Sequence, residues 1–263
     1  MTMLLQDKTA IVYGAAGAVG SAVAREFARE GARVVLTGRR IARLNAVATE
    51  ISAHGGQAET AVVDATDRAA VEEHAAAVAE AHGAIDISFN AIDPRGDLQG
   101  TPLLDLSEAD FITPITIAAT ANFLTATAAG RRMVPRGSGV ILMMSTSAAR
   151  LSGRDRRFHT IGGFGVACST VESLTANLAG EFSPHGVRVV CIRPDALVDT
   201  WPNEGIEESG EPSPVRTYMQ GGTLLDRLPR TTDVAETAAF LASDRARAMT
   251  ATVVNLSCGS VPE

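Results

Sequence analysis

The chain has very little lysine and tyrosine. In its 263 residues Lys8 is the only lysine, and Tyr13 and Tyr218 are the only tyrosines. Neither tyrosine has a lysine four residues after it. This excludes every mechanism that needs a tyrosine and a lysine on successive turns of one helix. Aromatic residues as a whole make up only 4% of the sequence, so the core must be built from aliphatic side chains.

Cysteine is scarce as well. Cys168, Cys191 and Cys258 are an odd number and lie in apolar segments without the spacing of metal ligands. They indicate reduced thiols in a cytoplasmic protein with no metal site. Residues 1–5 lack the charged start and apolar core of a signal peptide, and no apolar run is long enough to suggest a membrane span. A formal net charge of −7 argues against nucleic acid as the main partner.

The remaining sequence predicts one α/β domain over residues 1–263. Short β-type runs alternate with helical patterns to the end of the chain, which is typical of a doubly wound parallel sheet with helices on both faces. We expect helices that include 67–82 and 163–182, and about seven strands, at 9–13, 33–37, 61–64, 85–89, 140–144, 187–192 and 252–256.

A glycine-rich loop follows the first of these strands. Gly14, Gly17 and Gly20 lie between the strand and a helical stripe that begins at Val19. Such glycines let the backbone turn tightly and approach a pyrophosphate, while the amides of the next helix point at the phosphates. Strand, loop, helix and second strand within about thirty residues predict a dinucleotide site.

Residues 201–222 differ from the rest of the chain. They are acidic, rich in Pro, Gly and Ser, and follow a strand end where ligands bind in such sheets. A substrate lid and a flexible surface loop are both open interpretations.

Taken together, the chain resembles the single-domain branch of the short-chain dehydrogenase/reductase superfamily. The resemblance implies that Asp64 with Ala65 binds the adenine, that Asn90 with Ala91 lies beside the adenine ribose, and that Pro194 stands in a turn at the nicotinamide. Ala18 departs from the pattern, because this branch has a glycine there. The cofactor-binding residues implied are Gly14, Gly17, Ala18, Val19, Gly20, Asp64, Ala65, Asn90, Ala91, Pro194 and Leu197.

The end of the second strand bears on the choice of cofactor. Members that prefer NAD(H) have an acidic residue there, whereas this chain has Arg39 and Arg40. Two guanidiniums suit a 2′-phosphate, so NADP(H) is expected over NAD(H). The alternative to phosphate binding is that one of the two arginines only solvates the start of the following helix.

The catalytic positions of the family are altered. Alignment of the pattern puts Phe164 at the tyrosine position and Cys168 at the lysine position, while the helix asparagine falls on Ala118. The family's serine falls on the hydroxyl-bearing run that includes Ser145 and Thr146. Phe164 cannot transfer a proton, and a neutral thiol is a weak donor. Ordinary ketone reduction by the family mechanism is therefore not expected.

Other groups close in sequence could take part. His159 could act as an acid or base, although a solvated loop histidine is an open alternative. An arginine cluster could clamp an anionic substrate, or belong to a solvated loop or a subunit contact; its members are Arg150, Arg154, Arg156 and Arg157.

Three functions remain open. The first is an NADP(H)-dependent oxidoreductase of a small alcohol or carbonyl compound, with Ser145, Thr146, His159 or water in place of the usual proton donor. The second is an inactive NADP(H)-binding sensor or partner subunit, and the third is a non-redox enzyme such as a cyclase or dehydratase. The alanine-rich helix at 163–182 and the resemblance favour a homodimer or homotetramer.

Overall fold

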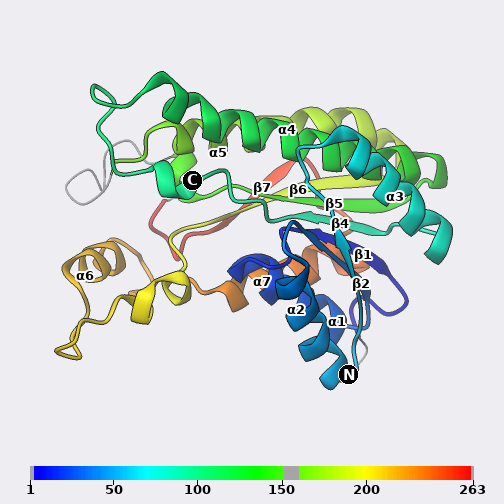
Figure 1. The fold of residues 1–263 in the computed structure, drawn as a ribbon, viewed down its shortest axis with the longest axis horizontal. Helices are drawn as coiled ribbons and strands as arrows, with labels where there is room; N and C mark the ends of the chain where they lie inside the picture. Colours follow the sequence, from blue (N-terminus) through cyan, green and yellow to red (C-terminus); the bar gives the residue numbers. More distant parts are fainter. Residues whose placement is uncertain (1–2, 151–159, 262–263) are drawn as a thin grey trace.

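The computed structural model, which describes residues 3–150 and 160–261, contains one seven-stranded parallel sheet (Figure 1). The strand order is β3-β2-β1-β4-β5-β6-β7, so the direction of winding reverses between β1 and β4. The single-domain doubly wound fold is thereby confirmed. The strands are β1 Thr9–Tyr13, β2 Arg33–Gly38, β3 Gln57–Val62, β4 Ile87–Asn90, β5 Gly139–Met144, β6 Val187–Pro194 and β7 Thr252–Leu256.

Helices cover both faces of the sheet. In Figure 1 one layer of helices, α3, α4 and α5, lies above the sheet and the other, α1, α2 and α7, lies below it. Alternate residues of a central strand therefore point into two separate cores: Val140 and Leu142 of β5 enter one, and Ile141 and Met143 enter the other. The helices are α1 Ala18–Arg29, α2 Ile41–Ala53, α3 Arg68–His82, α4 Glu108–Met133, α5 Gly163–Phe182, α6 Pro214–Gly221 and α7 Thr231–Ala242.

Short 3₁₀ turns join many of these elements. They are η1 Gly96–Leu98, η2 Val134–Arg136, η3 Ser147–Ala149, η4 Ser183–His185, η5 Val198–Thr200, η6 Pro202–Gly205 and η7 Asp244–Ala246.

Most strand boundaries lie within two residues of the expected ones, and those of β3 differ most. β3 begins at Gln57, four residues before the expected start, and its side chains are all exposed or half-buried. As an edge strand it needs no continuous apolar run, so only its last residues resembled a strand in the sequence. β4 extends to Asn90 and begins at Ile87 rather than at residue 85.

The helix starts follow their capping residues. The Asp67 carboxylate accepts the backbone N–H groups of Ala69 and Ala70 at the start of α3, and the Ser107 hydroxyl accepts that of Asp110 at the start of α4. The predicted helix start at Asp67 is confirmed.

The α4 segment requires a correction about membrane spans. Glu108–Arg136 is long and apolar enough to cross a membrane by length and composition alone, contrary to the expectation from the sequence. In the fold this helix packs against α5, and small residues of its inner face, such as Ala118, Ala121 and Ala128, are buried. Its apolar character is therefore explained by the core it helps to form.

The 201–222 segment has structure of its own. It contains η6 and α6, and a β-bridge joins Ile206 to Pro212. An ion pair between Glu204 and Arg230 ties it to the start of α7 at 2.6 Å. In Figure 1 it projects from the main body on the side where β6 ends.

Candidate cofactor and active site

The glycine loop closes against the neighbouring strand end. Gly14 has φ +76°, and a Cβ placed on it would lie 2.5 Å from the carbonyl oxygen of Ala91. A Cβ on Gly20 would lie 2.3 Å from the carbonyl oxygen of Gly14. Side chains at either position would therefore force the loop apart. The two glycines bring the β1 turn, the β4 end and α1 together at the reversal point of the sheet, where dinucleotides bind in such folds.

The start of α1 is open to an anion. Gly17 caps the helix without a side-chain hydrogen bond, and the first turn has no acidic residue. Gly17 and Ala18 are exposed, and Val19 is half-buried. The first-turn amides and the helix dipole therefore face solvent with no competing carboxylate. This arrangement fits a pyrophosphate.

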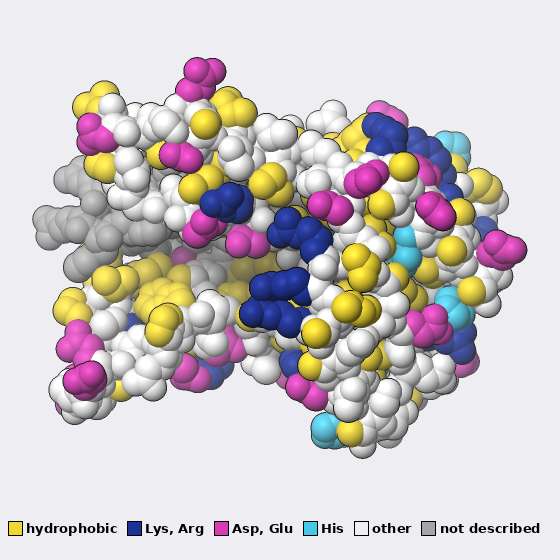
Figure 2. Space-filling model, in the orientation of Figure 1, with side chains coloured by type: hydrophobic (Ala, Val, Ile, Leu, Met, Phe, Trp, Pro, Cys, Tyr) yellow, Lys and Arg dark blue, Asp and Glu magenta, His cyan; other side chains and the backbone are white. Residues whose placement is uncertain are grey.

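Basic side chains follow β2. Arg39 and Arg40 are exposed, and Arg40 is the N-cap residue of α2. In Figure 2 basic side chains gather at the inner end of a hollow between the parts of the molecule that carry α5 and α6. Exposed guanidiniums at the end of β2 can bind a phosphate group.

Asp64 lies just beyond β3. Its Oδ1 accepts the backbone N–H of Thr66 at 2.9 Å and the Thr66 hydroxyl at 2.7 Å. These hydrogen bonds, with a smaller contribution from the charge of Arg39, lower the pKa of Asp64. The following Ala65 is buried. Asp64 therefore presents an ionised carboxylate on the same rim as Arg39.

Asn90 holds the turn after β4. Its Nδ2 donates to the Thr125 hydroxyl at 3.0 Å, and its Oδ1 accepts the backbone N–H of Ile92 at 2.9 Å. The backbone N–H of Ala91 donates to Tyr13 at the end of β1. The Asn90 side chain is thus engaged within the protein, where it fixes the backbone that meets Gly14.

At the end of β5, Thr146 and Cys168 meet. The Thr146 hydroxyl lies 3.4 Å from the Cys168 thiol on α5. Burial raises the pKa of Cys168, so the thiol is neutral at pH 7. Phe164, one turn earlier on α5, is half-buried and close to Gly96 of η1. Ala118 is buried in α4.

The Ser145 hydroxyl belongs to a buried cluster of charged side chains. Its hydroxyl donates to Glu172 Oε1 at 2.8 Å, and Arg193 Nε donates to the same oxygen at 2.8 Å. The side chains of Arg193 and Glu172 are 1% and 9% exposed. Arg150 Nε lies 3.6 Å from the other carboxylate oxygen of Glu172. A buried charged cluster therefore joins the ends of β5 and β6 to α5, and Arg150 already has a carboxylate partner.

Sequence reasoning missed Glu172, Asp195 and the buried role of Arg193. The signals were present: Glu172 lies four residues after Cys168 on the same face of α5, and Asp195 follows an apolar strand directly. His159 and the arginines at 154, 156 and 157 lie outside the described residues.

Comparison with known proteins decides the family. A family model described as enoyl-(acyl carrier protein) reductase matches residues 14–260. L-rhamnose 1-dehydrogenase (NAD(P)(+)) of Azotobacter vinelandii is 33% identical over 253 residues, covering 94% of each chain. The chain belongs to the short-chain dehydrogenase/reductase superfamily.

Other members of the superfamily match this chain over nearly its whole length. D-threitol dehydrogenase of Mycolicibacterium smegmatis is 29% identical over 242 residues, covering 92% of this chain and 88% of its own. The crystal structure of a short-chain type dehydrogenase/reductase from Mycobacterium marinum has a TM-score of 0.85 at 25% identity, and the match covers 100% of this chain and 98% of that one. A solved structure of 7α-hydroxysteroid dehydrogenase with NADH and 7-oxo glycochenodeoxycholic acid has a TM-score of 0.83 at 25% identity, covering 100% and 97%.

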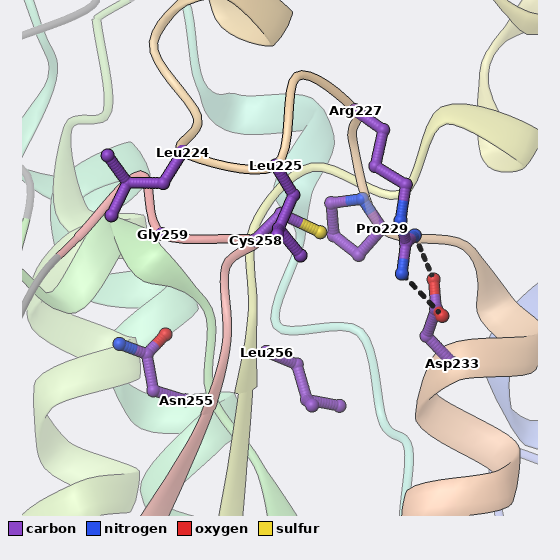
Figure 3. A pocket seen from close by; sticks show the side chains of 9 residues that line it. All are labelled: Leu224, Leu225, Arg227, Pro229, Asp233, Asn255, Leu256, Cys258 and Gly259. Carbon is purple, nitrogen blue, oxygen red and sulfur yellow. Dashed lines mark hydrogen bonds and ion pairs between the residues drawn. The ribbon is translucent and has the colours of Figure 1, made fainter.

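A separate cavity of about 370 Å³ lies at the end of β7. Figure 3 shows the Cys258 sulfur pointing toward Pro229, and the Arg227–Asp233 ion pair at 2.8 Å at one side. None of the residues expected to bind the cofactor lines it. The residues that line the cavity are Leu224, Leu225, Arg227, Pro229, Asp233, Asn255, Leu256, Cys258 and Gly259.

Among residues 3–150 and 160–261 no cluster of His, Cys, Asp and Glu could hold a metal ion.

Proposed function

We propose that the protein is an NADP(H)-dependent oxidoreductase that acts on a small alcohol or carbonyl compound through a non-standard active site. The observation that carries this proposal is the pair Arg39 and Arg40 beside an intact glycine loop. Guanidiniums bind phosphate through charge-assisted hydrogen bonds, and no carboxylate occupies the end of β2 to favour NAD(H). Two relatives are named as dehydrogenases of rhamnose and threitol, which supports a small polar substrate.

In this proposal the first-turn amides of α1 hold the pyrophosphate, and Arg39 and Arg40 hold the 2′-phosphate. Asp64 and Ala65 border the adenine, and Ala91 borders the adenine ribose. Pro194 and Leu197 border the nicotinamide. The bound cofactor supplies or accepts a hydride.

The residues of the chain must then manage the substrate oxygen and its proton. The Thr146 hydroxyl, half-exposed at the end of β5, can donate a hydrogen bond to that oxygen. Phe164 has no proton to give, and the buried Cys168 thiol is a weak acid. The lost proton donor is expected to cost about 10²–10⁴ in rate, unless His159 or water replaces it. We therefore expect slow turnover of simple ketones.

The segment 201–222 is proposed to act as a lid over the substrate. It leaves the sheet just after β6, and its η6 turn and α6 are attached to α7 through the Glu204–Arg230 pair. Loops that follow strand ends in such sheets commonly close over ligands.

An inactive NADP(H)-binding sensor or partner subunit is the second candidate. The observation that favours it is the combination of Phe164 with the buried neutral thiol of Cys168. A non-redox cyclase or dehydratase is the third candidate, and the glycine loop favours the other two over it.

We also propose a cytoplasmic homodimer or homotetramer. The outer surfaces of α4 and α5 expose Phe123 and Val166, and β7 is an edge strand of the sheet. A monomer in sedimentation at micromolar concentration would overturn this proposal.

The functional proposal is tested by titrating purified protein with NADPH, followed by a panel of aldehydes, ketones, sugars and polyols in both directions. We expect NADPH binding together with turnover of at least one polar member of the panel. Binding without any turnover would favour the inactive sensor, and absence of binding would overturn both.

A further inference from the structure

An exposed carboxylate lies just beyond the carboxyl end of β4. Asp93 follows the last residue of the strand, Asn90, closely, and its side chain is exposed. Its Oδ1 accepts the backbone N–H of Gly96, at the start of η1, at 2.9 Å. In the part of the chain that the structure describes, Oδ2 accepts no hydrogen bond. One carboxylate oxygen is therefore held in place while the other is available to a substrate.

Asp93 and Phe164 lie against the same glycine. A Cβ placed on Gly96 would lie 3.3 Å from Asp93 Oδ1 and 3.6 Å from Phe164 Cε2. Phe164 is one turn before Cys168 on α5, and the Cys168 thiol contacts the Thr146 hydroxyl at 3.4 Å. The Asp93 carboxylate is therefore close to the aromatic ring that leaves the cleft without a proton donor.

The neighbouring guanidinium is committed to another carboxylate. Arg95 Nε pairs with Asp97 at 2.7 Å. The contact with Asp97 is the main cause of the raised pKa of Arg95, and the charge of Asp93 contributes less. Within residues 3–150 and 160–261 no ion pair joins Asp93 to a basic side chain. The basic oxygen of Asp93 is therefore not occupied by an arginine.

The location of Asp93 relative to the cofactor follows from the proposed function, on which this step rests. A dinucleotide held at the start of α1 crosses the sheet edge at the reversal point between β1 and β4. With its adenine half over β2 and β3, its nicotinamide half lies over the ends of β4 and β5. Asp93 and Thr146 follow these two paired strands, so both stand on the nicotinamide side.

We propose that Asp93 is the general base of the reaction, in place of the missing tyrosine. In the oxidising direction the O–H bond of the alcohol breaks, and its proton moves to the Asp93 carboxylate. The adjacent C–H bond breaks as well, and the hydrogen leaves with the electron pair as a hydride to the oxidised cofactor. A C=O bond forms in the product, and Asp93 then passes the proton to water. The Thr146 hydroxyl holds the substrate oxygen through a hydrogen bond.

A carboxylate base gives the cleft a preferred direction. Aspartate side chains are ionised at neutral pH, so they accept a proton readily and seldom have one to donate. The site therefore favours alcohol oxidation over ketone reduction. This direction agrees with the slow turnover of simple ketones expected from Phe164 and Cys168.

The test measures NADPH formation at saturating NADP⁺ with the sugar or polyol that the wild-type protein oxidises fastest. Asp93→Asn keeps the shape of the side chain without its basicity. Asp93→Gly removes the side chain and leaves room for added formate, which is a small carboxylate base. Asp97→Asn is the matched control, because Asp97 is a second exposed carboxylate in the same turn. The dissociation constant of NADP⁺ is measured for every variant by displacement of NADPH.

In both Asp93 variants we expect kcat for oxidation to fall by about 10²–10⁴-fold, while the dissociation constant of NADP⁺ stays within about twofold of wild type. Formate should raise the rate of Asp93→Gly at least about tenfold and leave wild type and Asp97→Asn unchanged. Asp97→Asn should oxidise the substrate as wild type does.

Three results would overturn this inference alone: wild-type turnover by Asp93→Asn, no effect of formate on Asp93→Gly, or a loss of NADP⁺ affinity as large as the loss of rate. The last would show a structural role for Asp93. Failure of the wild-type protein to bind NADP⁺, or to oxidise any member of the panel, would overturn the proposed function and this inference together.

Discussion

The Thr146 hydroxyl and the Cys168 thiol lie 3.4 Å apart between the end of β5 and α5. The contact shows that the hydroxyl after β5 and the helix position four residues beyond Phe164 share one site. Cys168 is buried there with a raised pKa, so the site holds a neutral thiol where the superfamily resemblance implies an ammonium.

The double change Phe164→Tyr with Cys168→Lys should therefore increase turnover. It supplies a proton donor on α5 and a positive charge that lowers the pKa of that donor. We expect NADPH oxidation with a simple ketone to rise by about tenfold to a hundredfold. Each single change should do less, because an unaided tyrosine titrates near pH 10. Fast ketone turnover by wild-type protein would contradict this account of the cleft, and His159 would then be the first residue to mutate.

Gly20→Ala should damage the cofactor cradle. Its Cβ would lie 2.3 Å from the backbone oxygen of Gly14, which cannot move aside as a side chain can. We expect a loss of about 1–3 kcal/mol in the free energy of unfolding, together with weaker NADPH binding. Gly180→Ala is the control, since nothing lies within 4 Å of its Cβ in α5; it should stabilise the fold by about 0.5–1 kcal/mol. Chemical denaturation measures the free energy of unfolding of both variants. Equal changes in the two would rule out the close approach of Gly20 to the Gly14 carbonyl oxygen.

Glu172→Gln should destabilise the fold strongly. It removes the carboxylate from beside Arg193, whose side chain is 1% exposed. Breaking a buried pair from one side typically costs about 3–5 kcal/mol. The exposed pair Arg25–Glu50 provides the control, because its side chains are 44% and 54% exposed and Glu50→Gln should cost less than about 1 kcal/mol. Similar denaturation midpoints for the two variants would show that the Glu172 cluster contributes little to stability.

The acid titration of Asp64 should depend on Thr66. The Thr66 hydroxyl is the main cause of the lowered pKa of Asp64, so Thr66→Val should move that pKa up toward its ordinary value. Because the folded-state pKa is lowered, Asp64 stabilises the fold above its unfolded pKa of about 3.9, and this contribution is lost as the pH falls through the folded value. NMR titration of the Asp64 carboxyl group checks the shift. An unaltered pKa in Thr66→Val would show that the hydroxyl is not the main cause and would leave the backbone N–H of Thr66 and the charge of Arg39.

Elements that depend on residue spacing within a short stretch of the chain could be predicted from the sequence. The glycine loop, the start of α3 at Asp67 and the limits of α5 follow from spacing along the chain, and the structure has them in place. β3 was placed too late because an edge strand carries little apolar pattern.

The partners of the buried charges at the carboxyl edge could not be predicted in the same way. Ser145 and Glu172 are 27 residues apart, and Ser147 and Asp195 are 48 apart. Their contacts depend on how β5, β6 and α5 pack, which no local period encodes. The helix α6 was equally hidden, because its segment is rich in residues that usually mark loops.

The most direct test of the account is a fluorescence titration of wild-type protein with NADPH and with NADH. We expect NADPH to bind at least tenfold more tightly, because Arg39 and Arg40 are available to its 2′-phosphate. Arg39→Asp should narrow or reverse the difference. Equal affinities of the wild-type protein for the two cofactors would contradict the assignment of an NADP(H) site to this cleft.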